Sequence, residues 1–338
     1  MPLLSFVPAT ATVAGELDGS STNRSDTVQT RAVGSLQASV IGLGCNNFGR
    51  RLDEEQSSAV VHAALDAGVT FFDTADIYGG TRSEEILGRA LGSRRDEIAV
   101  ATKFGMPVDE DRRGAKPDYV LRAVEDSLRR LGTDHIDLYQ LHTPDQDTPI
   151  ADTLGALDSL VRSGKVLEIG CSNFDAKQLV EADDAAAPGT ARFVSVQNEY
   201  SLLHRDPEAE VLPECERLGL AFIPYFPLMS GLLSGKYRRG EAPPPGTRLG
   251  TYSAEDVAEH MTEQNLDAVD RLSAWAGERG HTTLELAVAW LLARPAVATV
   301  IAGASTPEQV RQNVAAATWQ LTPAEASEVE ALAPPAGG

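Results

Sequence analysis

The sequence predicts an α/β protein that folds as a closed (β/α)8 TIM barrel, with an N-terminal hairpin and a long loop after the seventh strand. Eight short apolar runs alternate with longer runs of helical periodicity, as in a parallel sheet covered by helices. The alternative, a doubly wound open sheet, would place Gly-x-Gly-x-x-Gly before its first helix. Gly42-Leu43-Gly44 starts such a motif, but Asn47 stands where the third glycine belongs, so the barrel is favoured.

The charge balance limits the partners that the chain can have. Its 338 residues carry 29 basic and 49 acidic side chains, which give a net charge of -20. This field repels nucleic acids and anionic membranes, so we expect small-molecule partners, and an anionic ligand would need a local cluster of positive groups. The same balance leads us to expect no membrane partner and a cytoplasmic location, and no apolar run approaches the roughly 18 residues of a membrane-spanning helix. The composition leaves the oligomeric state open.

The first 29 residues differ in composition from the rest. Residues 1–29 are rich in Ser, Thr, Ala and Gly and have no sustained period, which predicts a disordered tail. A secretory signal would carry positive charge ahead of its apolar core, but the first basic residue is Arg24. Residues 30–338 are predicted to form a single barrel domain.

The cysteines predict neither disulfides nor a metal site. Cys45, Cys171 and Cys215 are odd in number and widely spaced, and no paired-cysteine metal motif is present. We expect all three to be reduced and buried as small apolar side chains.

The predicted strands follow one another in a regular order. A hairpin over residues 31–40, with its turn at Gly34-Ser35, precedes the barrel. The eight barrel strands are predicted to end near Gly44, Asp73, Lys103, His142, Cys171, Gln197, Tyr225 and Ile301.

Helical periodicity predicts helices over residues 54–67, 83–91, 117–131, 150–163, from 175 onward, 207–218, 262–279, 282–293, 307–317 and 323–332. Gly68 follows the first helix, Ser83 is placed to cap the second, and Pro117 occupies the first turn of the third. Between residues 227 and 262 the alternation breaks, around the run Pro243-Pro244-Pro245-Gly246. A loop of that length in a compact domain usually covers or forms a binding site.

The ends of the predicted strands carry the candidate site, because the carboxyl ends of barrel strands meet at one mouth. The residues at these ends are polar or amphipathic: Asp73, Lys103, His142, Ser172, Asn173, Gln197 and Tyr225. Taken singly, Asp73 is equally well a turn cap, Lys103 a solvated lysine and His142 a satisfied buried histidine. Six neighbouring strands that end this way favour one shared site.

Several motifs occur in the order found in one enzyme family. They are Phe72-Asp73-Thr74-Ala75-Asp76-Ile77-Tyr78-Gly79, Ser83-Glu84-Glu85-Ile86-Leu87-Gly88, Thr102-Lys103, Gln140-Leu141-His142, Gly170-Cys171-Ser172-Asn173-Phe174, Gln197-Asn198-Glu199-Tyr200, Pro227-Leu228, Gly231-Leu232-Leu233-Ser234-Gly235-Lys236-Tyr237 and Gly303-Ala304-Ser305 with Pro307-Glu308-Gln309 and Asn313. With these motifs the chain resembles the aldo-keto reductase family from about residue 30 to 332. The resemblance is strongest to the branch of potassium-channel β subunits and related bacterial reductases.

The resemblance implies an enzyme that reduces an aldehyde or ketone to an alcohol, with a tetrad of Asp73, Tyr78, Lys103 and His142. Carbonyl reduction needs a hydride on carbon and a proton on the oxygen, and Tyr78 is implied as the proton donor. We expect Lys103 to lower the pKa of the Tyr78 phenol and Asp73 to hold Lys103. His142 would position the carbonyl oxygen. Whether His142 is charged stays open.

The hydride must come from a cofactor, and the resemblance implies NADPH, with NADH as the other possibility. Ser172, Asn173 and Gln197 would hold the nicotinamide carboxamide, the Tyr225 ring would stack on the nicotinamide, and the loop at Pro227 would bind the pyrophosphate. The complete implied cofactor set is Cys45, Asn46, Asp73, Ser172, Asn173, Gln197, Tyr225, Phe226, Pro227, Leu228, Ser230, Gly231, Lys236, Arg248, Gly303, Ser305, Gln309, Gln312 and Asn313. Within it Lys236, Arg248 and Ser305, which precedes a helix, are candidates for binding the 2'-phosphate.

The chain departs from the family pattern at three places. Gly303 and Gln309 stand where many members have a lysine and an arginine, and Gln312 stands where an acid commonly faces the adenine. The first loop, Cys45-Asn46-Asn47, differs from versions that contain threonine. The substrate itself cannot be identified from the loops expected to shape its pocket, which lie around Asn47 and over residues 106–116, 143–147 and 238–260. Met106 and Phe104 are either an apolar wall or local packing.

Two other functions are compatible with parts of the sequence. One is a cofactor-sensing interaction subunit of the channel β-subunit type, in which catalysis is secondary. The other is a barrel lyase that uses Lys103 as a Schiff-base amine. The lyase makes no use of Ser172, Gln197 and Tyr225.

Overall fold

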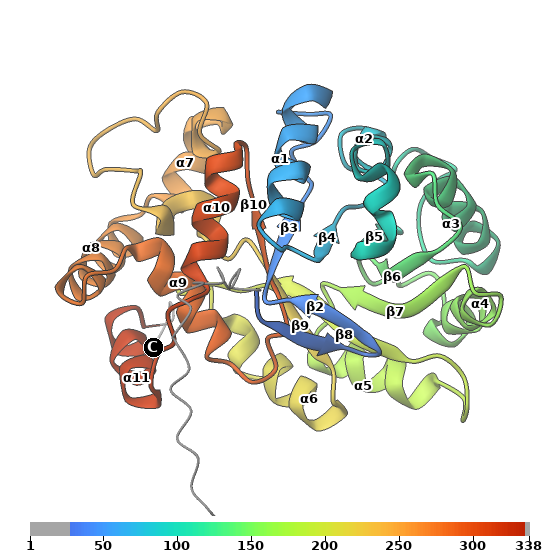
Figure 1. Cartoon of the computed structure of the whole chain (residues 1–338). Coiled ribbons are helices and arrows are strands. Elements are labelled where there is room, and N and C mark those ends of the chain that lie inside the picture. The colour runs from blue at the N-terminus through green and yellow to red at the C-terminus, as the bar shows by residue number, and fades with distance from the viewer. Residues whose placement is uncertain (1–27, 335–338) are drawn as a thin grey trace, which may run out of the picture.

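A computed structural model describes residues 28–334, and the predicted TIM barrel is confirmed (Figure 1). Eight parallel strands are hydrogen-bonded in the order β10-β3-β4-β5-β6-β7-β8-β9. Their bounds are β3 (Ile41–Gly44), β4 (Phe71–Asp73), β5 (Ala99–Phe104), β6 (Ile136–Leu141), β7 (Val166–Ser172), β8 (Phe193–Glu199), β9 (Ala221–Tyr225) and β10 (Val300–Gly303). Backbone bonds from Phe222 N to Ala296 O (2.7 Å) and from Ala298 N to Phe222 O (3.0 Å) join β9 to the segment that leads into β10 and close the barrel.

Helices surround the barrel in the predicted alternation. They are α1 (Glu54–Asp66), α2 (Arg82–Leu91), α3 (Pro117–Leu131), α4 (Ile150–Arg162), α5 (Ala176–Ala185), α6 (Val211–Leu218), α7 (Ala254–His260), α8 (Glu263–Glu278), α9 (Thr283–Leu292), α10 (Pro307–Ala316) and α11 (Pro323–Leu332). The single helix predicted over residues 207–218 is instead a short 3-10 turn, η2 (Asp206–Glu208), followed by α6. The predicted insert after β9 contains two further 3-10 turns, η3 (Met229–Ser234) and η4 (Leu249–Thr251), and the short helix α7.

The predicted N-cap of α2 is wrong. The capping residue is Thr81, and Ser83 lies buried inside the first turn of the helix. The Ser83 hydroxyl donates to the Cys45 carbonyl (2.9 Å) and shares a hydrogen bond with the Thr74 hydroxyl (2.8 Å). A buried hydroxyl needs partners, and these two loops supply them, so Ser83 ties α2 to the segments after β3 and β4.

The predicted hairpin closes the amino end of the barrel. β1 (Thr30–Val33) pairs antiparallel with β2 (Leu36–Ser39) across the expected turn. Val33 and Ala38 are fully buried and belong to the inner cluster of the barrel, with Phe71, Leu138 and Ile223. The hairpin therefore leaves the opposite, carboxyl end of the barrel as the mouth.

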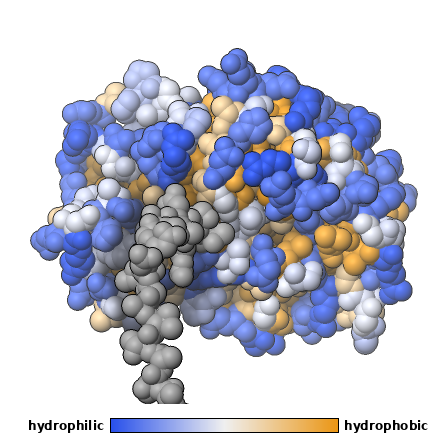
Figure 2. All heavy atoms as spheres, in the orientation of Figure 1, coloured by the Kyte–Doolittle hydropathy of each residue, from blue (hydrophilic) through white to orange (hydrophobic). Residues whose placement is uncertain are grey.

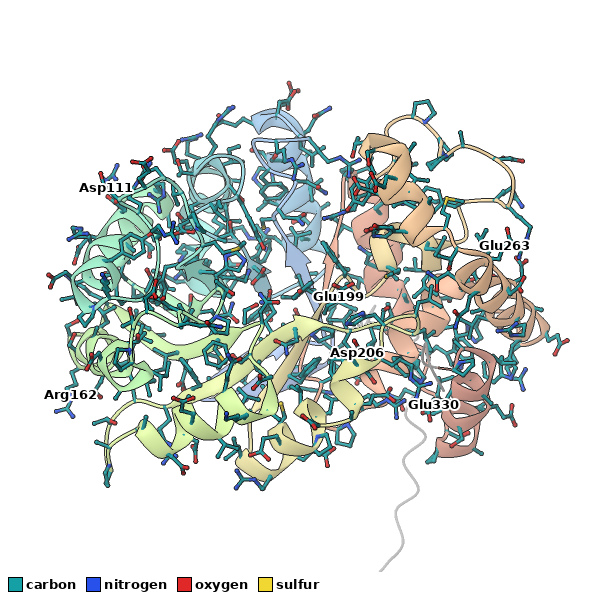
Figure 3. All side chains as sticks on the ribbon, turned by 180° about the vertical axis from the view of Figure 1, so that it is seen from behind. Asp111, Arg162, Glu199, Asp206, Glu263 and Glu330 are labelled. Carbon is teal, nitrogen blue, oxygen red and sulfur yellow. The ribbon has the colours of Figure 1, made fainter. Side chains whose placement is uncertain are left out.

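The outer core lies between the barrel and its helices, and polar residues cover most of the surface. Figure 2, which has the orientation of Figure 1, shows mainly hydrophilic residues on the side facing the viewer, with scattered hydrophobic clusters. On the far side, η2 lies beside α11, as the labelled Asp206 and Glu330 show (Figure 3). Arg205 donates to the carbonyls of Glu330 (3.3 Å) and Ala333 (3.2 Å), which fixes α11 against the barrel.

Two sequence expectations concern membranes and the tail. Among residues 28–334, no helix has the length and apolarity needed to cross a bilayer. The predicted disordered tail, residues 1–29, lies outside the described residues except for Val28 and Gln29.

Candidate active site

A cavity of about 460 Å³ opens at the carboxyl ends of the strands. It brings together most of the site residues that the sequence predicted. The predicted residues that line it are Asn46, Asp73, Tyr78, His142, Ser172, Asn173, Gln197, Tyr225, Phe226, Pro227, Leu228, Ser230, Gly231, Lys236, Arg248, Gly303, Ser305 and Gln309. The strand ends thus converge on one mouth, as expected for a parallel barrel.

Four predicted residues do not line the cavity. Lys103 is fully buried behind Asp73, and Cys45 is fully buried with its thiol 3.7 Å from the Leu43 carbonyl. Asn313 is buried in α10, and Gln312 points to solvent, where its amide lies 3.4 Å from a Glu308 oxygen. Lys103 contacts the cavity residue Asp73, whereas the cofactor roles expected of the other three residues stay predictions.

Asp73 and Lys103 form a buried ion pair beneath the cavity. The Lys103 ammonium donates to both Asp73 carboxylate oxygens (2.7 and 2.5 Å) and to the Thr74 carbonyl (2.9 Å). Burial is the largest single effect on the pKa of Lys103 and lowers it, but Asp73 and Tyr78 together outweigh burial, so the pKa is raised. Gln197 donates a further bond to Asp73 (2.9 Å). Lys103 is therefore a fixed positive charge whose three N–H donors are all in use.

Tyr78 lies beside this pair, with its ring centroid 5.1 Å from the Lys103 nitrogen. Lys103 acts on the pKa of Tyr78 in the expected direction and lowers it, but the net pKa of Tyr78 is raised. Burial of the phenol is the largest cause and exceeds the opposing attraction of Lys103, while Asp73 also raises the pKa. Tyr78 therefore holds its proton through the neutral pH range.

His142 faces Tyr78 edge to face, with ring centroids 5.8 Å apart. Burial, and then repulsion from Lys103, lower the pKa of His142 to about 3. Its Nδ1 atom is buried and has no hydrogen-bond partner among residues 28–334. His142 is therefore a neutral imidazole, which answers the question of charge that the sequence left open.

The ends of β6, β7, β8 and β9 are joined by polar groups. Ser172 donates to the Gln197 carbonyl (2.7 Å), and Asn173 donates to the His142 carbonyl (2.8 Å). The Asn173 amide oxygen accepts a bond from the Tyr225 hydroxyl (2.8 Å). This network orients four neighbouring strand ends around the cavity.

Backbone strain is concentrated around the cavity. Five non-glycine residues between positions 28 and 334 have positive φ, and four of them lie at this site: Asn173 (62°), Phe226 (50°), Met229 (45°) and Ser230 (54°). Such conformations persist only where surrounding contacts impose them, and they are common at ligand sites. Here the Tyr237 hydroxyl supports the loop by donating to the Ser230 carbonyl (3.3 Å).

Arg51 is a cavity residue that the sequence reasoning missed. It lies on the loop between β3 and α1 and lines the cavity with Lys236 and Arg248 of the insert. We call these three residues the cationic cluster. The adjacent arginines at positions 50 and 51, just after a strand end, were the only available signal. Two further lining residues, Gly44 and Ile301, were not named as site residues, whereas Gly246 and Thr247 belong to the loop 238–260 that was expected to shape the pocket.

The loops expected to shape a substrate pocket have mixed outcomes. Asn47 and Met106 line the cavity. Phe104 does not, because it is fully buried and stacks on Tyr139 in the outer core at 4.7 Å, so it is a packing residue. Residues 144–147 line a separate hollow with Ala115.

The cavity has the donors that a dinucleotide needs. The cationic cluster offers positive charge, and Ser305 lines the cavity just before the N-terminus of α10, the end of a helix that favours anions. Lys236 has no hydrogen-bond or ion-pair partner within the described part of the chain, so its three N–H donors are available to an anion. These residues therefore fit a ligand that carries phosphate groups.

Comparisons with known proteins agree with this geometry. A sequence model described as the aldo/keto reductase family matches residues 40–334. A protein named uncharacterized oxidoreductase YrpG, from Bacillus subtilis strain 168, is 38% identical over 300 residues, covering 85% of this chain and 89% of that protein. The structure of a glycerol dehydrogenase from Gluconobacter oxydans is similar with a TM-score of 0.77 and 31% identity, covering 91% of this chain and 95% of that one.

Proposed function

The chain belongs to the aldo-keto reductase family and is an oxidoreductase, and from that premise we propose that it reduces an aldehyde or ketone with NADPH, using Tyr78 as the proton donor. The observation that carries the proposal is the buried Asp73–Lys103 pair beside a protonated Tyr78 and a neutral His142 in one cavity. The family acts on small carbonyl compounds and uses nicotinamide cofactors.

We assign the proton transfer to Tyr78 because it lines the cavity and keeps its proton at neutral pH. When the phenol gives up this proton, negative charge develops on its oxygen. The fixed charge of Lys103 stabilises that phenolate, and Asp73 prevents the ammonium from moving away. The positive charge of Lys103 thus lowers the barrier to proton transfer from Tyr78, although Lys103 itself transfers no proton.

We assign His142 the role of positioning the substrate carbonyl. As a neutral imidazole it carries one N–H, and its Nδ1 is enclosed by protein, so Nε2 is the nitrogen left to face the cavity. A neutral donor binds the carbonyl oxygen without competing with Tyr78 as an acid.

NADPH, when bound, supplies the hydride. We propose that Ser172, Asn173 and Gln197 hold its carboxamide and that the ring of Tyr225 stacks on the nicotinamide, because these side chains line one side of the cavity. The backbone of the strained loop around Ser230 is proposed to bind the pyrophosphate. The preference for NADPH over NADH rests on the cationic cluster, since only NADPH carries a third phosphate group.

The lyase alternative is disfavoured by the state of Lys103. Its ammonium is fully buried and bound by Asp73 and the Thr74 carbonyl, and its pKa is raised, so it is a poor nucleophile. No observation on residues 28–334 favours the regulatory-subunit alternative.

The proposal is tested with purified protein, NADPH and a panel of aldehydes and ketones, by following the absorbance of the reduced nicotinamide. The panel includes glyceraldehyde and dihydroxyacetone, because one structural relative is named a glycerol dehydrogenase. Tyr78→Phe should abolish turnover while NADPH still binds. Tyr119→Phe removes a phenol that does not line the cavity, and it should retain activity. Turnover by Tyr78→Phe at the wild-type rate would rule out Tyr78 as the donor.

A further inference from the structure

Met106 lines the mouth cavity on the side opposite the insert. It follows β5, whereas Lys236 and Arg248 belong to the insert after β9, and the strand order places β5 and β9 across the barrel from each other. Figure 1 shows α3, which follows β5, and α7 of the insert on opposite sides of the molecule. A backbone bond from His142 N to the Phe104 carbonyl (2.8 Å) keeps the start of the Met106 loop beside His142. The side chain of Met106 therefore borders the end of the cavity where the carbonyl is proposed to bind.

The loop that carries Met106 is closed at its base. It runs over residues 105–116, between β5 and α3. Gly114 N donates to the Gly105 carbonyl (2.8 Å), so the two ends of the loop lie side by side. Both glycines have positive φ, 109° at Gly105 and 80° at Gly114, which residues with a side chain rarely adopt. Because Met106 directly follows Gly105, its position depends on where the chain near Gly114 is held.

Asp145, on the loop between β6 and α4, holds this chain. Its Oδ2 accepts hydrogen bonds from Ala115 N (2.7 Å) and from the Thr148 hydroxyl (2.8 Å). Its Oδ1 accepts a hydrogen bond from Asp147 N (3.0 Å). The Ala115 carbonyl in turn accepts a bond from the hydroxyl of Thr153 in α4 (3.0 Å). Both backbone polar groups of Ala115 are thus bound by the segment that follows His142.

The Asp145 side chain is held as a carboxylate. Burial raises its pKa, but the bonds from Ala115 N, the Thr148 hydroxyl and Asp147 N together outweigh burial, so the pKa is lowered. Hydrogen bonds to a charged acceptor are stronger than neutral ones. A Cβ added at Gly114 would lie 2.9 Å from Asp145 Oδ2, so the loop also packs closely against the carboxylate.

We propose that Asp145 is a positioning residue that holds Met106 as an apolar wall of the substrate site, and that this wall selects aldehydes with an unbranched apolar chain. This inference rests on the proposed function, in which Tyr78 and His142 bind the carbonyl in the same cavity. Asp145 does not itself line the cavity, so it acts only through the loop. A methionine side chain is unbranched and flexible, and it adapts to an alkyl chain.

The test measures kcat and KM of the full-length protein, at saturating NADPH, for the straight-chain aldehydes from propanal to hexanal. In the wild type kcat/KM should rise by about 3- to 4-fold for each added methylene, the gain from burying one such group. Met106→Ala and Asp145→Ala should each reduce this gain to less than about 2-fold, mainly through KM, because the lost contact is remote from the reacting carbonyl. The double variant should be no worse than either single variant, because both changes remove the same contact.

Matched variants separate this role from a general loss of structure. Asp147→Asn removes an exposed charge from the same loop but keeps the backbone N–H that binds Asp145, so it should retain the wild-type dependence on chain length. Asp145→Asn keeps one oxygen to accept the bonds from Ala115 and Thr148, so it should retain most of that dependence. Gly114→Ala should push the loop away from Asp145 and weaken the dependence, which keeps the test decisive if Asp145→Ala does not fold. Thermal unfolding establishes which variants are folded, and the affinity for NADPH should stay within about 2-fold in Asp145→Ala, because Asp145 lies outside the cavity.

Three results overturn the inference. If Met106→Ala keeps the wild-type dependence on chain length, Met106 is not a wall of the substrate site. If only Asp145→Ala keeps it, Asp145 does not position Met106. If Asp145→Ala lowers kcat/KM by the same factor for every aldehyde, its role is general support of the structure. Failure of the proposed function is distinct, because the wild type would then reduce none of these aldehydes with NADPH.

Discussion

The buried carboxyl group of Asp76 should make the stability of the protein fall as the pH rises. Asp76 is 3% exposed, and one of its oxygens, Oδ1, has no hydrogen-bond partner among residues 28–334. The other oxygen lies at a weak 3.4 Å from the Tyr119 hydroxyl. Burial raises the pKa of Asp76 from 3.8 to about 7, with repulsion from Glu84 as the second cause. Arg130 opposes this shift but is itself bound to Glu84 at 2.6 Å.

The magnitude follows from the difference between the folded and unfolded pKa values. The folded protein holds the proton up to about pH 7, whereas the unfolded chain releases it near pH 4. Unfolding therefore becomes easier as the pH rises between these values and changes no further above them. A difference of about 3 units, at about 1.4 kcal/mol per unit, corresponds to about 4 kcal/mol. Asp76→Asn removes this loss because its amide is never charged.

The assay is urea unfolding of the wild type and Asp76→Asn at about pH 5 and about pH 8. The stability of the variant relative to the wild type should increase by about 3 kcal/mol between these two conditions. Asp96→Asn, which neutralises an exposed carboxylate, controls for the loss of one negative charge and should follow the wild type. An unchanged difference between Asp76→Asn and the wild type at the two pH values would refute a shifted Asp76.

Three further predictions concern the site and its support. Because His142 stays neutral down to about pH 3 and Tyr78 has a raised pKa, neither residue should ionise between about pH 5 and about pH 8, and kcat/KM for carbonyl reduction should show no titration of either one. A pH-dependent change of kcat/KM in this range that disappears in His142→Gln would contradict the neutral imidazole. Lys103→Met leaves the buried Asp73 without its counter-ion and should lower the free energy of unfolding in urea by about 3–5 kcal/mol. The control Arg89→Met breaks an exposed pair with Glu54 and should lower it by less than about 1 kcal/mol. Equal losses in the two variants would contradict a stabilising role of the buried pair. Gly88→Ala should lower the free energy of unfolding by about 1–3 kcal/mol, because the added Cβ would lie 2.2 Å from the Leu131 carbonyl oxygen. Gly277→Ala, in another helix with open space around the glycine, should raise it by about 0.5–1 kcal/mol in the same assay. A stabilising Gly88→Ala would show that α3 moves aside freely.

The alternation of strands and helices was predictable because the burial of a parallel barrel leaves a periodic pattern in the sequence. The convergence of Asp73, His142, Ser172 and Gln197 on one cavity was predictable for a related reason. All four lie near a strand's carboxyl end, and a closed barrel brings those ends together. No local conformation had to be known for this inference. Tyr78 lies beyond the end of β4, and its place in the site was expected only from the family motif.

The rest of the site depends on tertiary contacts that no local pattern encodes. Arg51 joins the cavity only because the insert folds back over it, and that path is set by bonds such as Leu249 N to the Tyr237 hydroxyl (3.1 Å). The sequence places Asn313 near the site but does not reveal that its side chain is buried in α10. The sign of the Tyr78 pKa shift also needed the structure, because burial and Asp73 raise the pKa while Lys103 lowers it.

The left-handed backbone at Phe226, Met229 and Ser230 lowers the stability of the folded protein but keeps the loop beside the cavity in one shape. A residue other than glycine in this conformation costs roughly 1–2 kcal/mol, so glycine at any of the three positions would relieve strain in the folded state. The same substitution would release the loop from the single shape that borders the cavity, and it would give the unfolded chain more freedom. Selection for a more heat-resistant protein would therefore act most productively on the helices, where it leaves the shape of this loop unchanged.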